Sequence, residues 1–441
     1  MAKIKTKDMA LPASGHSLCA AGAKRECPEA GTPLVNYEVC LAGSRLAEKS
    51  KNKRVSRWKR RNIAQNWVAR EIKCENLRDG LEKKLPRTFW CGHALKGFNT
   101  IDVRCSDQEN HANANFSGIQ YCGSVWECPV CSALIRNKRA HDVSQGVENW
   151  LSESHGVFML TLTTRHYQCD SLRDSLECIT KAWRSITSLK AWKDLRIDME
   201  LEGYIRSLEV THGTNGWHPH FHFLLFSKKI AAINDAQMIE NIVLEAWKKA
   251  VPKNGGRLPN EHGVKVRCVG GENQGDIAAE YISKVFDGKH VSLEMARSDL
   301  KTTLGDEAES ITPFELLDFP DNMHCARLWQ EYRTAIKGKR SIFFTKGLRK
   351  LLGLTLDKTD EEIIEELQSV GELVVQVPAD VYEKKIKTNA EIAVQMLELI
   401  EKKKYEEAAC LVGCNVEIRE LLDKKTGCLV ECRVMKKLAI K

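Results

Sequence analysis

The chain has 441 residues, of which 43% are hydrophobic and 29% charged, an ordinary composition for a folded protein of two or three domains. No apolar run approaches the ~20 residues that a membrane-spanning helix needs, and the N-terminal segment has no long apolar core. We therefore expect no membrane partner and no secretory signal. The net charge of +8 is modest for this length, so its distribution is more informative than its size.

Basic residues are concentrated near the N-terminus. The segment Lys49–Asn62 carries eight Lys or Arg residues, including Lys59, Arg60 and Arg61, and no acid. A polyanion such as nucleic acid is one natural partner for this segment. A solvated, flexible arm explains it equally well. We expect residues 1–87 to form a basic, partly disordered region with a helix that continues to about Lys84.

The next region is 88–150, which we expect to be a cysteine-rich module followed by a basic helix. Its first part, up to Cys131, is rich in cysteines and in residues that favour turns. From Ser132 to Leu151 the spacing predicts a helix. This helix starts with basic side chains that we expect to contact DNA: Arg136, Lys138 and Arg139.

Strand and helix patterns then alternate over 151–310. Two strands joined by a tight TNGW turn predict an antiparallel hairpin, so we expect an α+β fold with an antiparallel sheet flanked by helices. The predicted strands are Val157–His166, Tyr204–Gly213, His218–Phe226 and Val264–Val269. The predicted helices are Leu172–Leu195, Ala236–Ala250 and Asp276–Phe286. We expect a helical extension over 311–355 and a charged helical region over 356–441.

The sequence HPHFH places three histidines at alternate positions of one predicted strand. His218, His220 and His222 then share a face of the sheet, and Glu209 lies on the partner strand. Imidazoles and a nearby carboxylate can hold a divalent ion that keeps positions open for a phosphate oxygen. The alternative is a row of half-buried or surface histidines without a metal.

Tyr281 and Lys284 lie three residues apart in the helical segment EYISK. Side chains at this spacing are neighbours on a helix, and a lysine there helps to stabilise a phenolate or a phosphate. A phenolate can attack phosphorus. A YxxK pair also occurs by chance, so an ordinary amphipathic helix is the competing interpretation.

The chain contains 17 cysteines, a number that does not fit a small secreted disulfide scaffold. Cys128 and Cys131 form a CxxC pair, which supplies two thiolates on one turn to a structural zinc ion. The other half of the site would come from Cys91, His93, Cys105 or Cys122. Thiols without a metal, or with a redox role, are the alternatives.

Taken in order, these motifs resemble the HUH endonucleases, and more narrowly the plasmid rolling-circle replication initiators. The matching pieces are FMLTLTT (Phe158–Thr164), KAWRSI (Lys181–Ile186), SLEVTHGTNGWHPHFHFLLF (Ser207–Phe226), EAWKKA (Glu245–Ala250) and AAEYISKVF (Ala278–Phe286). WECPVCSALIRNKR before them, and TPFELL and LWQEYRTAIKGKRSIFFTKGLRKLLGL after them, are also similar to such initiators. The similarity covers roughly Thr88–Leu354.

The resemblance implies an enzyme of the bacterial cytoplasm that nicks and rejoins origin DNA. Its activity would depend on Mg²⁺ or Mn²⁺ and would form a 5′-phosphotyrosine intermediate. It implies Tyr281 as nucleophile, His220, His222 and Glu209 as metal ligands with His218 as a further candidate, and Lys284 in support. A host helicase and polymerase are implied as partners.

Some of these initiators have a second acidic residue one helical turn before the tyrosine, and this sequence departs from that pattern. Ile277 stands four residues before Tyr281, and Asp276 and Glu280 flank that place. Either acid could activate water at termination, or termination could proceed differently from that in those initiators. Three rival functions stay open: a histidine-triad nucleotide hydrolase or transferase, a non-catalytic DNA-binding regulator, and an HUH relaxase or transposase.

Overall fold

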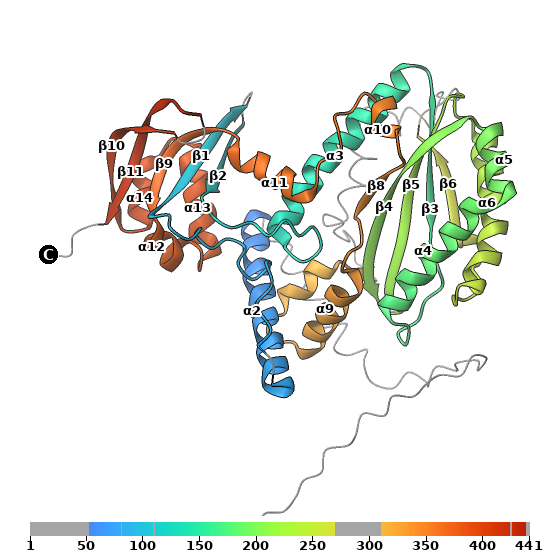
Figure 1. Ribbon diagram of the computed structural model, residues 1–441, viewed down its shortest axis with the longest axis horizontal. Coiled ribbons are helices and arrows are strands. Elements are labelled where there is room, and N and C mark those ends of the chain that lie inside the picture. Colours follow the sequence, from blue (N-terminus) through green and yellow to red (C-terminus); the bar gives the residue numbers. More distant parts are fainter. Residues whose placement is uncertain (1–52, 81, 109–110, 270–309, 424–425, 438–441) are drawn as a thin grey trace, which may run out of the picture. The chain divides into compact units, whose positions relative to one another are not determined.

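The computed structural model describes residues 53–80, 82–108, 111–269, 310–423 and 426–437. Two β-sheets with packed helices make up this part of the chain (Figure 1). The expected α+β class with antiparallel strands is confirmed. Within the described residues, no helix has the length and apolar character needed to cross a bilayer.

The first sheet contains the histidine hairpin. Its strand order is β6-β3-β5-β4-β7, with β8 also paired to β4, and each of these pairings is antiparallel. The strands are β3 (Gly156–Leu162), β4 (Leu201–Gly213), β5 (Gly216–Ser227), β6 (Val264–Cys268), β7 (Ser310–Ile311) and β8 (Ile342–Phe344). β4 and β5 are joined by a tight turn that ends at Gly216, whose φ of +86° favours glycine.

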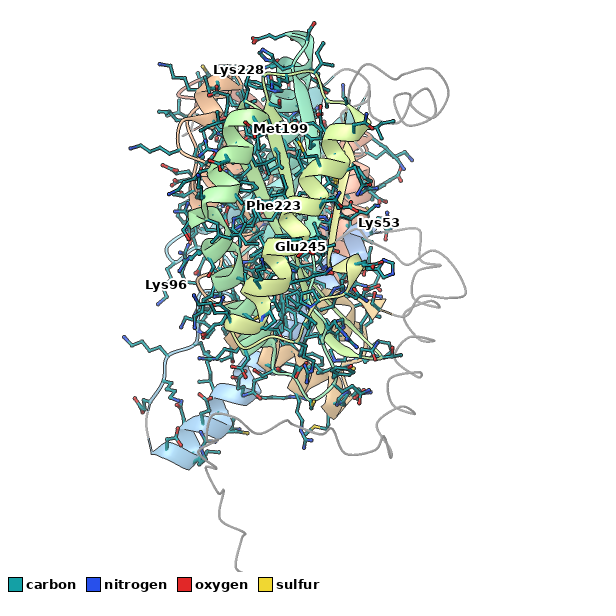
Figure 2. All side chains as sticks on the ribbon, turned by 90° about the vertical axis from the view of Figure 1, so that its right-hand side faces the viewer. Lys53, Lys96, Met199, Phe223, Lys228 and Glu245 are labelled. Atoms are coloured by element: carbon teal, nitrogen blue, oxygen red, sulfur yellow. The ribbon has the colours of Figure 1, made fainter. Side chains whose placement is uncertain are left out.

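Helices cover both faces of this sheet. Successive β5 side chains point to opposite faces, so each face presents apolar side chains for helices to pack against. Phe221, Phe223 and Leu225 pack under α4 (Leu172–Ser188) and α6 (Ile233–Lys253) in the largest core cluster. Figure 2 shows these two helices side by side across the sheet. On the opposite face, Leu224 and Phe226 pack against α3 (Pro129–Ser152) and α10 (Leu348–Leu351).

The predicted helix Leu172–Leu195 is two helices in the structure. α4 ends at Ser188, Leu189 has an extended backbone (φ −68°, ψ 149°), and α5 (Lys190–Asp198) follows. The side chain of Ser171 caps α4 by accepting a hydrogen bond from the Asp174 backbone N–H. Near the N-terminus, α2 (Lys53–Asp79) ends before the expected Lys84, and Gly80 follows it with a φ of +64°.

A second sheet joins segments that lie far apart in the sequence. Its order is β10-β11-β9-β1-β2, antiparallel except for the parallel pair β9–β11. The strands are β1 (Thr100–Gln108), β2 (His111–Ser117), β9 (Glu372–Pro378), β10 (Cys414–Leu422) and β11 (Leu429–Lys437). The remaining elements are η1 (Glu261–Gly263), η3 (Pro313–Asp318), α9 (Met323–Ile336), α11 (Asp360–Ser369), α12 (Ala379–Val381), η4 (Tyr382–Ile386), α13 (Ala390–Glu401) and α14 (Tyr405–Leu411).

These strands correct two expectations. The region before Cys131 contains β1 and β2 in addition to its turns, and the C-terminal region contains three strands in addition to its helices. Ile101 on β1 pairs with Val377 on β9, and both are fully buried. The second sheet forms because each segment buries its apolar face against the other, and neither segment has that partner nearby in the sequence.

Candidate functional site

Three side chains converge on the sheet face opposite α4 and α6. Glu209 on β4 pairs in register with His220 on β5, and Ser207 pairs with His222. Since cross-strand partners share a face, Glu209, His220 and His222 point the same way. All three are buried, with exposures of 1%, 8% and 4%.

The distances within this triad suit a single metal ion. Glu209 Oε2 lies 3.0 Å from His220 Nε2 and 3.1 Å from His222 Nε2. Neighbouring ligands of an octahedral ion, each bonded at ~2.1 Å, lie about 3.0 Å apart. The candidate ligand atoms of all three residues lie within 4.8 Å of one another.

The other nitrogens of the two imidazoles also have hydrogen-bond partners, and that of His220 fixes the tautomer of its ring. His220 Nδ1 is 3.3 Å from the His218 carbonyl oxygen, which can only accept, so Nδ1 carries the proton. His222 Nδ1 is 3.1 Å from Thr161 Oγ1 on β3. With its proton on Nδ1, His220 directs the Nε2 lone pair at the Glu209 carboxylate, an arrangement that requires a cation or a further proton between them.

The donor set defines what such a centre can do. Two imidazoles and one carboxylate leave further coordination positions free for substrate oxygen and water. A divalent ion in this position could polarise a carbonyl or phosphoryl oxygen. The residues therefore fit the Mg²⁺ or Mn²⁺ site expected from the sequence, while the geometry does not select the ion.

His218 lies next to the triad and is not one of the three converging ligands. Its ring centroid is 4.9 Å from that of His220, and it stacks on His166 at 4.5 Å with an interplanar angle of 12°. Burial, helped by the neighbouring imidazoles of His220 and His166, lowers the pKa of His218 to about 3. The ring is therefore neutral at neutral pH.

The proposed nucleophile and its neighbours are outside the described residues. These are Asp276, Glu280, Tyr281 and Lys284, and the predicted helix Asp276–Phe286 lies there too. β6 is the last described strand before them. Their roles therefore remain predictions.

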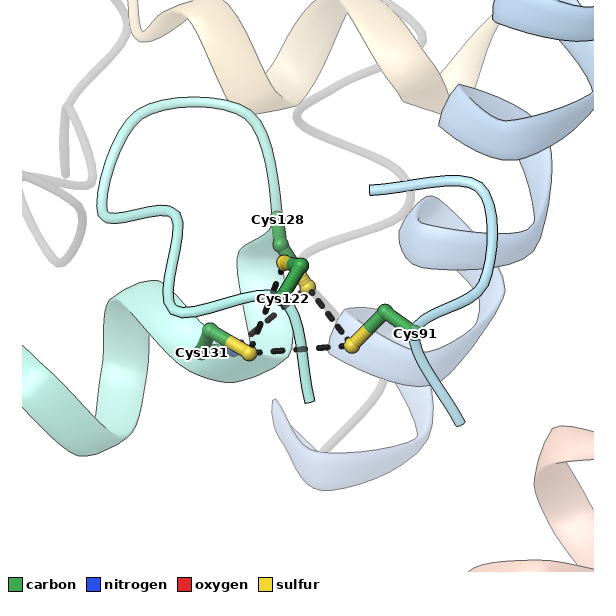
Figure 3. A group of neighbouring side chains, drawn as sticks. All are labelled: Cys91, Cys122, Cys128 and Cys131. Carbon is green, nitrogen blue, oxygen red and sulfur yellow. Dashed lines mark hydrogen bonds between the residues drawn. The ribbon is translucent and has the colours of Figure 1, made fainter. Parts of the chain in front are cut away.

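Four cysteines form a second group (Figure 3). Cys91 Sγ lies 3.6 Å from both Cys128 Sγ and Cys131 Sγ, and Cys122 Sγ lies 3.7 Å from Cys131 Sγ. A tetrahedron of thiolates around zinc, with Zn–S bonds of ~2.3 Å, has edges of about 3.8 Å. The sulfurs thus stand at zinc-site spacing, and all four cysteines are free and buried.

Local structure positions these thiols. Cys128 caps α3, where its sulfur accepts a hydrogen bond from the Cys131 backbone N–H, and Pro129 begins the helix. Hydrogen bonds from Cys122, Cys128 and Cys131 lower the pKa of the Cys91 thiol well below its ordinary value, while contacts within the same group raise the pKa of the Cys122 and Cys131 thiols. A thiolate is the form that binds metal.

Two further zinc candidates are not in this group. Cys105 lies on β1, and His93 Nδ1 pairs with Glu383 Oε2 at 3.3 Å. The sequence could not choose among the cysteines because CxxC identifies only one half of a site. The structure selects Cys91 and Cys122 as the other half of the group.

The six basic residues expected to bind DNA all make contacts within the chain. Arg61 and Arg136 are 2% and 3% exposed, so a DNA phosphate does not reach them in this conformation. Both guanidinium groups lie over tryptophan rings, those of Trp58 and Trp126. The other four form ion pairs: Lys59 with Glu391, Arg60 with Asp318, Lys138 with Asp142, and Arg139 with Asp357.

Comparisons with known proteins identify relatives. A family model described as "Replication protein" matches residues 115–389, which is more than half of the chain. "Protein rep" of Streptomyces lividans is 31% identical over 309 residues, covering 56% of this chain and 66% of the relative. A "Neomycin resistance protein" of Streptomyces cyanogenus is 29% identical over 133 residues, covering 24% of this chain and 30% of that protein. The chain spans less than two thirds of either relative, and no solved structure gives a significant match.

Proposed function

The chain belongs to this family of replication proteins, and from that premise we propose that it is a plasmid rolling-circle replication initiator with HUH endonuclease chemistry. Its proposed substrate is plasmid origin DNA, single-stranded or supercoiled, in the bacterial cytoplasm. A host helicase and polymerase are the proposed partners. The observation that carries the proposal is the convergence of Glu209, His220 and His222 on one point.

The proposed reaction is a phosphoryl transfer. The Tyr281 hydroxyl attacks the scissile phosphorus, an O–P bond to the tyrosine forms, and the P–O3′ bond breaks. The phenolic proton is lost and the leaving 3′ oxygen gains one, giving a 5′-phosphotyrosine and a free 3′ hydroxyl. Attack of a 3′ hydroxyl on the phosphotyrosine reverses the transfer and rejoins the strand.

The described residues contribute positioning and charge. Glu209, His220 and His222 would hold Mg²⁺ or Mn²⁺, which supplies stabilisation of negative charge on a phosphate oxygen. The hydrogen bonds at His220 Nδ1 and His222 Nδ1 orient the two rings toward Glu209. His218 is retained as an additional candidate ligand, and Lys284 as support for the phenolate or phosphate. Asp276 or Glu280 is the proposed base for water at termination.

We assign zinc to the group of Cys91, Cys122, Cys128 and Cys131, in a structural role. These residues tie the turn that follows α2 to the start of α3. We propose residues 151–310 as the nuclease domain, preceded by the zinc module. Direct DNA contacts by Lys59, Arg60, Lys138 and Arg139 would require their ion pairs to open.

Nicking of supercoiled DNA that carries the gene and its flanking sequence tests the proposal. With Mn²⁺ the wild type should produce nicked circles, and chelator should abolish them. Replacing a residue that only supports a metal ligand typically lowers activity by ~10–100-fold. Glu209→Gln changes a proposed ligand itself, so we expect it to lower the nicking rate by more than that. Glu202→Gln is the matched control, because Glu202 lies on the same strand and forms an ion pair with Lys228. Nicking that survives chelator and Glu209→Gln would refute the metal-dependent mechanism.

A further inference from the structure

A pocket of about 320 Å³ lies beside the metal-ligand histidines. Its walls come from three segments: residues 163–167 after β3, Asn215 and His218 of the β4–β5 hairpin, and the turn between Pro259 and Gly263 before β6. His218 belongs to this pocket and also neighbours His220 of the triad, with 4.9 Å between ring centroids. The pocket and the candidate metal centre therefore share a wall.

Hydrogen bonds fix the three walls relative to one another. The Thr163 backbone N–H donates to the Gly263 carbonyl at 2.9 Å, and Trp247 Nε1 on α6 donates to the Thr163 carbonyl at 2.8 Å. Gln168 Nε2 donates to the Thr214 carbonyl in the hairpin turn at 2.7 Å. A pocket held in this way is formed before a ligand arrives, so little ordering entropy is lost on binding.

The chemistry of the lining favours a flat, polar ligand. The imidazoles of His166 and His218 lie nearly parallel, and the Tyr167 ring is held against the Arg257 guanidinium at 4.5 Å. Asn215 and Asn260 bring amide groups. Among the described residues that line the pocket there is no carboxylate, so nothing there repels a neighbouring phosphate.

These are the side chains with which proteins bind unstacked bases. Aromatic and imidazole rings stack on base faces, and amides and Arg hydrogen-bond to base edges. Arg165 is exposed, and its Nη2 lies 3.3 Å from the Tyr167 hydroxyl, which places a positive charge at the pocket. The volume lies near the lower end of the ~300–1,000 Å³ found for small-molecule sites.

We propose that this pocket receives the base of a nucleotide that flanks the scissile phosphate in single-stranded DNA. The inference rests on the proposed function and adds a specificity subsite to it. A base seated against His218 has its phosphate next to the His220 side of the metal centre. Bases inside a duplex are stacked and paired, so the pocket requires an unwound origin or an extruded base.

Photo-crosslinking tests this subsite without requiring cleavage. The full chain is mixed, without added Mg²⁺ or Mn²⁺, with single-stranded oligonucleotides of random sequence that carry one central 5-iodouracil. After irradiation, crosslinked peptides are mapped by mass spectrometry. We expect crosslinks within residues 163–167, 215–218 or 259–263. Asn215→Leu, which replaces the amide with a bulky aliphatic side chain that neither hydrogen-bonds to a base nor offers it an aromatic ring, should lower crosslinking to these segments by about fivefold or more.

Asn241→Leu is the matched control, since Asn241 is an exposed asparagine on α6, and it should crosslink as the wild type does. Circular dichroism checks that both variants are folded. Crosslinks that map only outside the three segments, no crosslinks at all, or equal yields from Asn215→Leu and wild type would overturn the subsite. Nicking is measured in a separate assay. A protein that nicks DNA but gives no crosslinks in these segments would refute only the subsite. A protein that gives the crosslinks but does not nick would refute the proposed function and leave the base pocket in place.

Discussion

Thr161 on β3 lies directly opposite His222 on β5, and its Oγ1 is 3.1 Å from Nδ1 of that imidazole. This contact joins a third strand to the pair of strands that carries the candidate metal ligands. A hydrogen bond between Nδ1 and this hydroxyl directs Nε2 toward Glu209. Thr161 is thus a positioning residue that acts through His222.

Replacing Thr161 with valine should weaken Mn²⁺ binding by roughly 10–100-fold, because His222 loses the hydrogen-bond partner that holds its ring orientation. Thr161→Ser keeps the hydroxyl and should restore affinity. Calorimetric titration with Mn²⁺ measures both variants against the wild type. Equal affinities for Thr161→Val and wild type would show that the contact does not orient the ligand.

Zinc content tests the cysteine group. Cys131→Ser should lose a bound zinc ion and lower the midpoint of thermal unfolding, by about 2–4 °C for each kcal/mol of lost stability. Cys178→Ser and Cys105→Ser are controls, because Cys178 is buried on α4 and Cys105 lies on β1, both outside the group. Elemental analysis of purified protein gives the zinc stoichiometry. Zinc that is retained in Cys131→Ser would contradict the assignment.

The second sheet contains an ion pair that is nearly inaccessible to solvent. Arg104 Nη1 and Nη2 donate to the Asp423 carboxylate at 3.1 and 2.6 Å, and Nε donates to the Gly371 carbonyl. Asp423→Asn should lower the free energy of unfolding by about 3–5 kcal/mol, because it leaves a buried guanidinium without its counter-charge. Urea unfolding measures this, with the exposed Glu420→Gln on β10 as a nearly neutral control.

Acid should destabilise the protein partly through His212. Burial, with smaller effects from His324 and His166, lowers the pKa of His212 to about 4. The unfolded chain therefore takes up the proton first, so this contribution to stability is complete above about pH 6.5 and is lost as the pH falls toward 4. The slope for one histidine is at most about 1.4 kcal/mol per pH unit.

His212→Gln should flatten the fall in unfolding free energy between about pH 6.5 and about pH 5. His141→Gln serves as control because His141 is exposed on α3. Urea unfolding at several pH values within this window compares the three proteins. A slope that is the same in His212→Gln and wild type would exclude His212 as a source of the acid sensitivity.

The sequence predicted the first sheet well because its signals are local. Alternation in HPHFHF places His220 and His222 on one face, and the tight turn before them brings β4 alongside, with Glu209 in register. Thr161 escaped prediction as a partner of His222, although the alternation in the TLT strand was visible. The pairing of β3 with β5 was needed to bring the two side chains together.

Long-range partners could not be predicted in this way. ELVVQVP alternates as a strand should, but its pairing partner β1 lies more than two hundred residues earlier in the chain. The basic side chains show the same limit. A sequence displays the charge of Arg60 or Arg139 but not the acid, Asp318 or Asp357, that folding places beside it.

The central claim, covalent catalysis by tyrosine at a metal-dependent site, is tested most directly by locating the DNA on the protein. The adduct formed with Mn²⁺ is digested with nuclease and protease, and the peptide that carries the nucleotide is sequenced by mass spectrometry. The account predicts a phosphonucleotide on Tyr281, with no adduct from Tyr281→Phe and normal yield from Tyr405→Phe. A nucleotide attached to His218, His220 or His222, or an undiminished adduct in Tyr281→Phe, would contradict it.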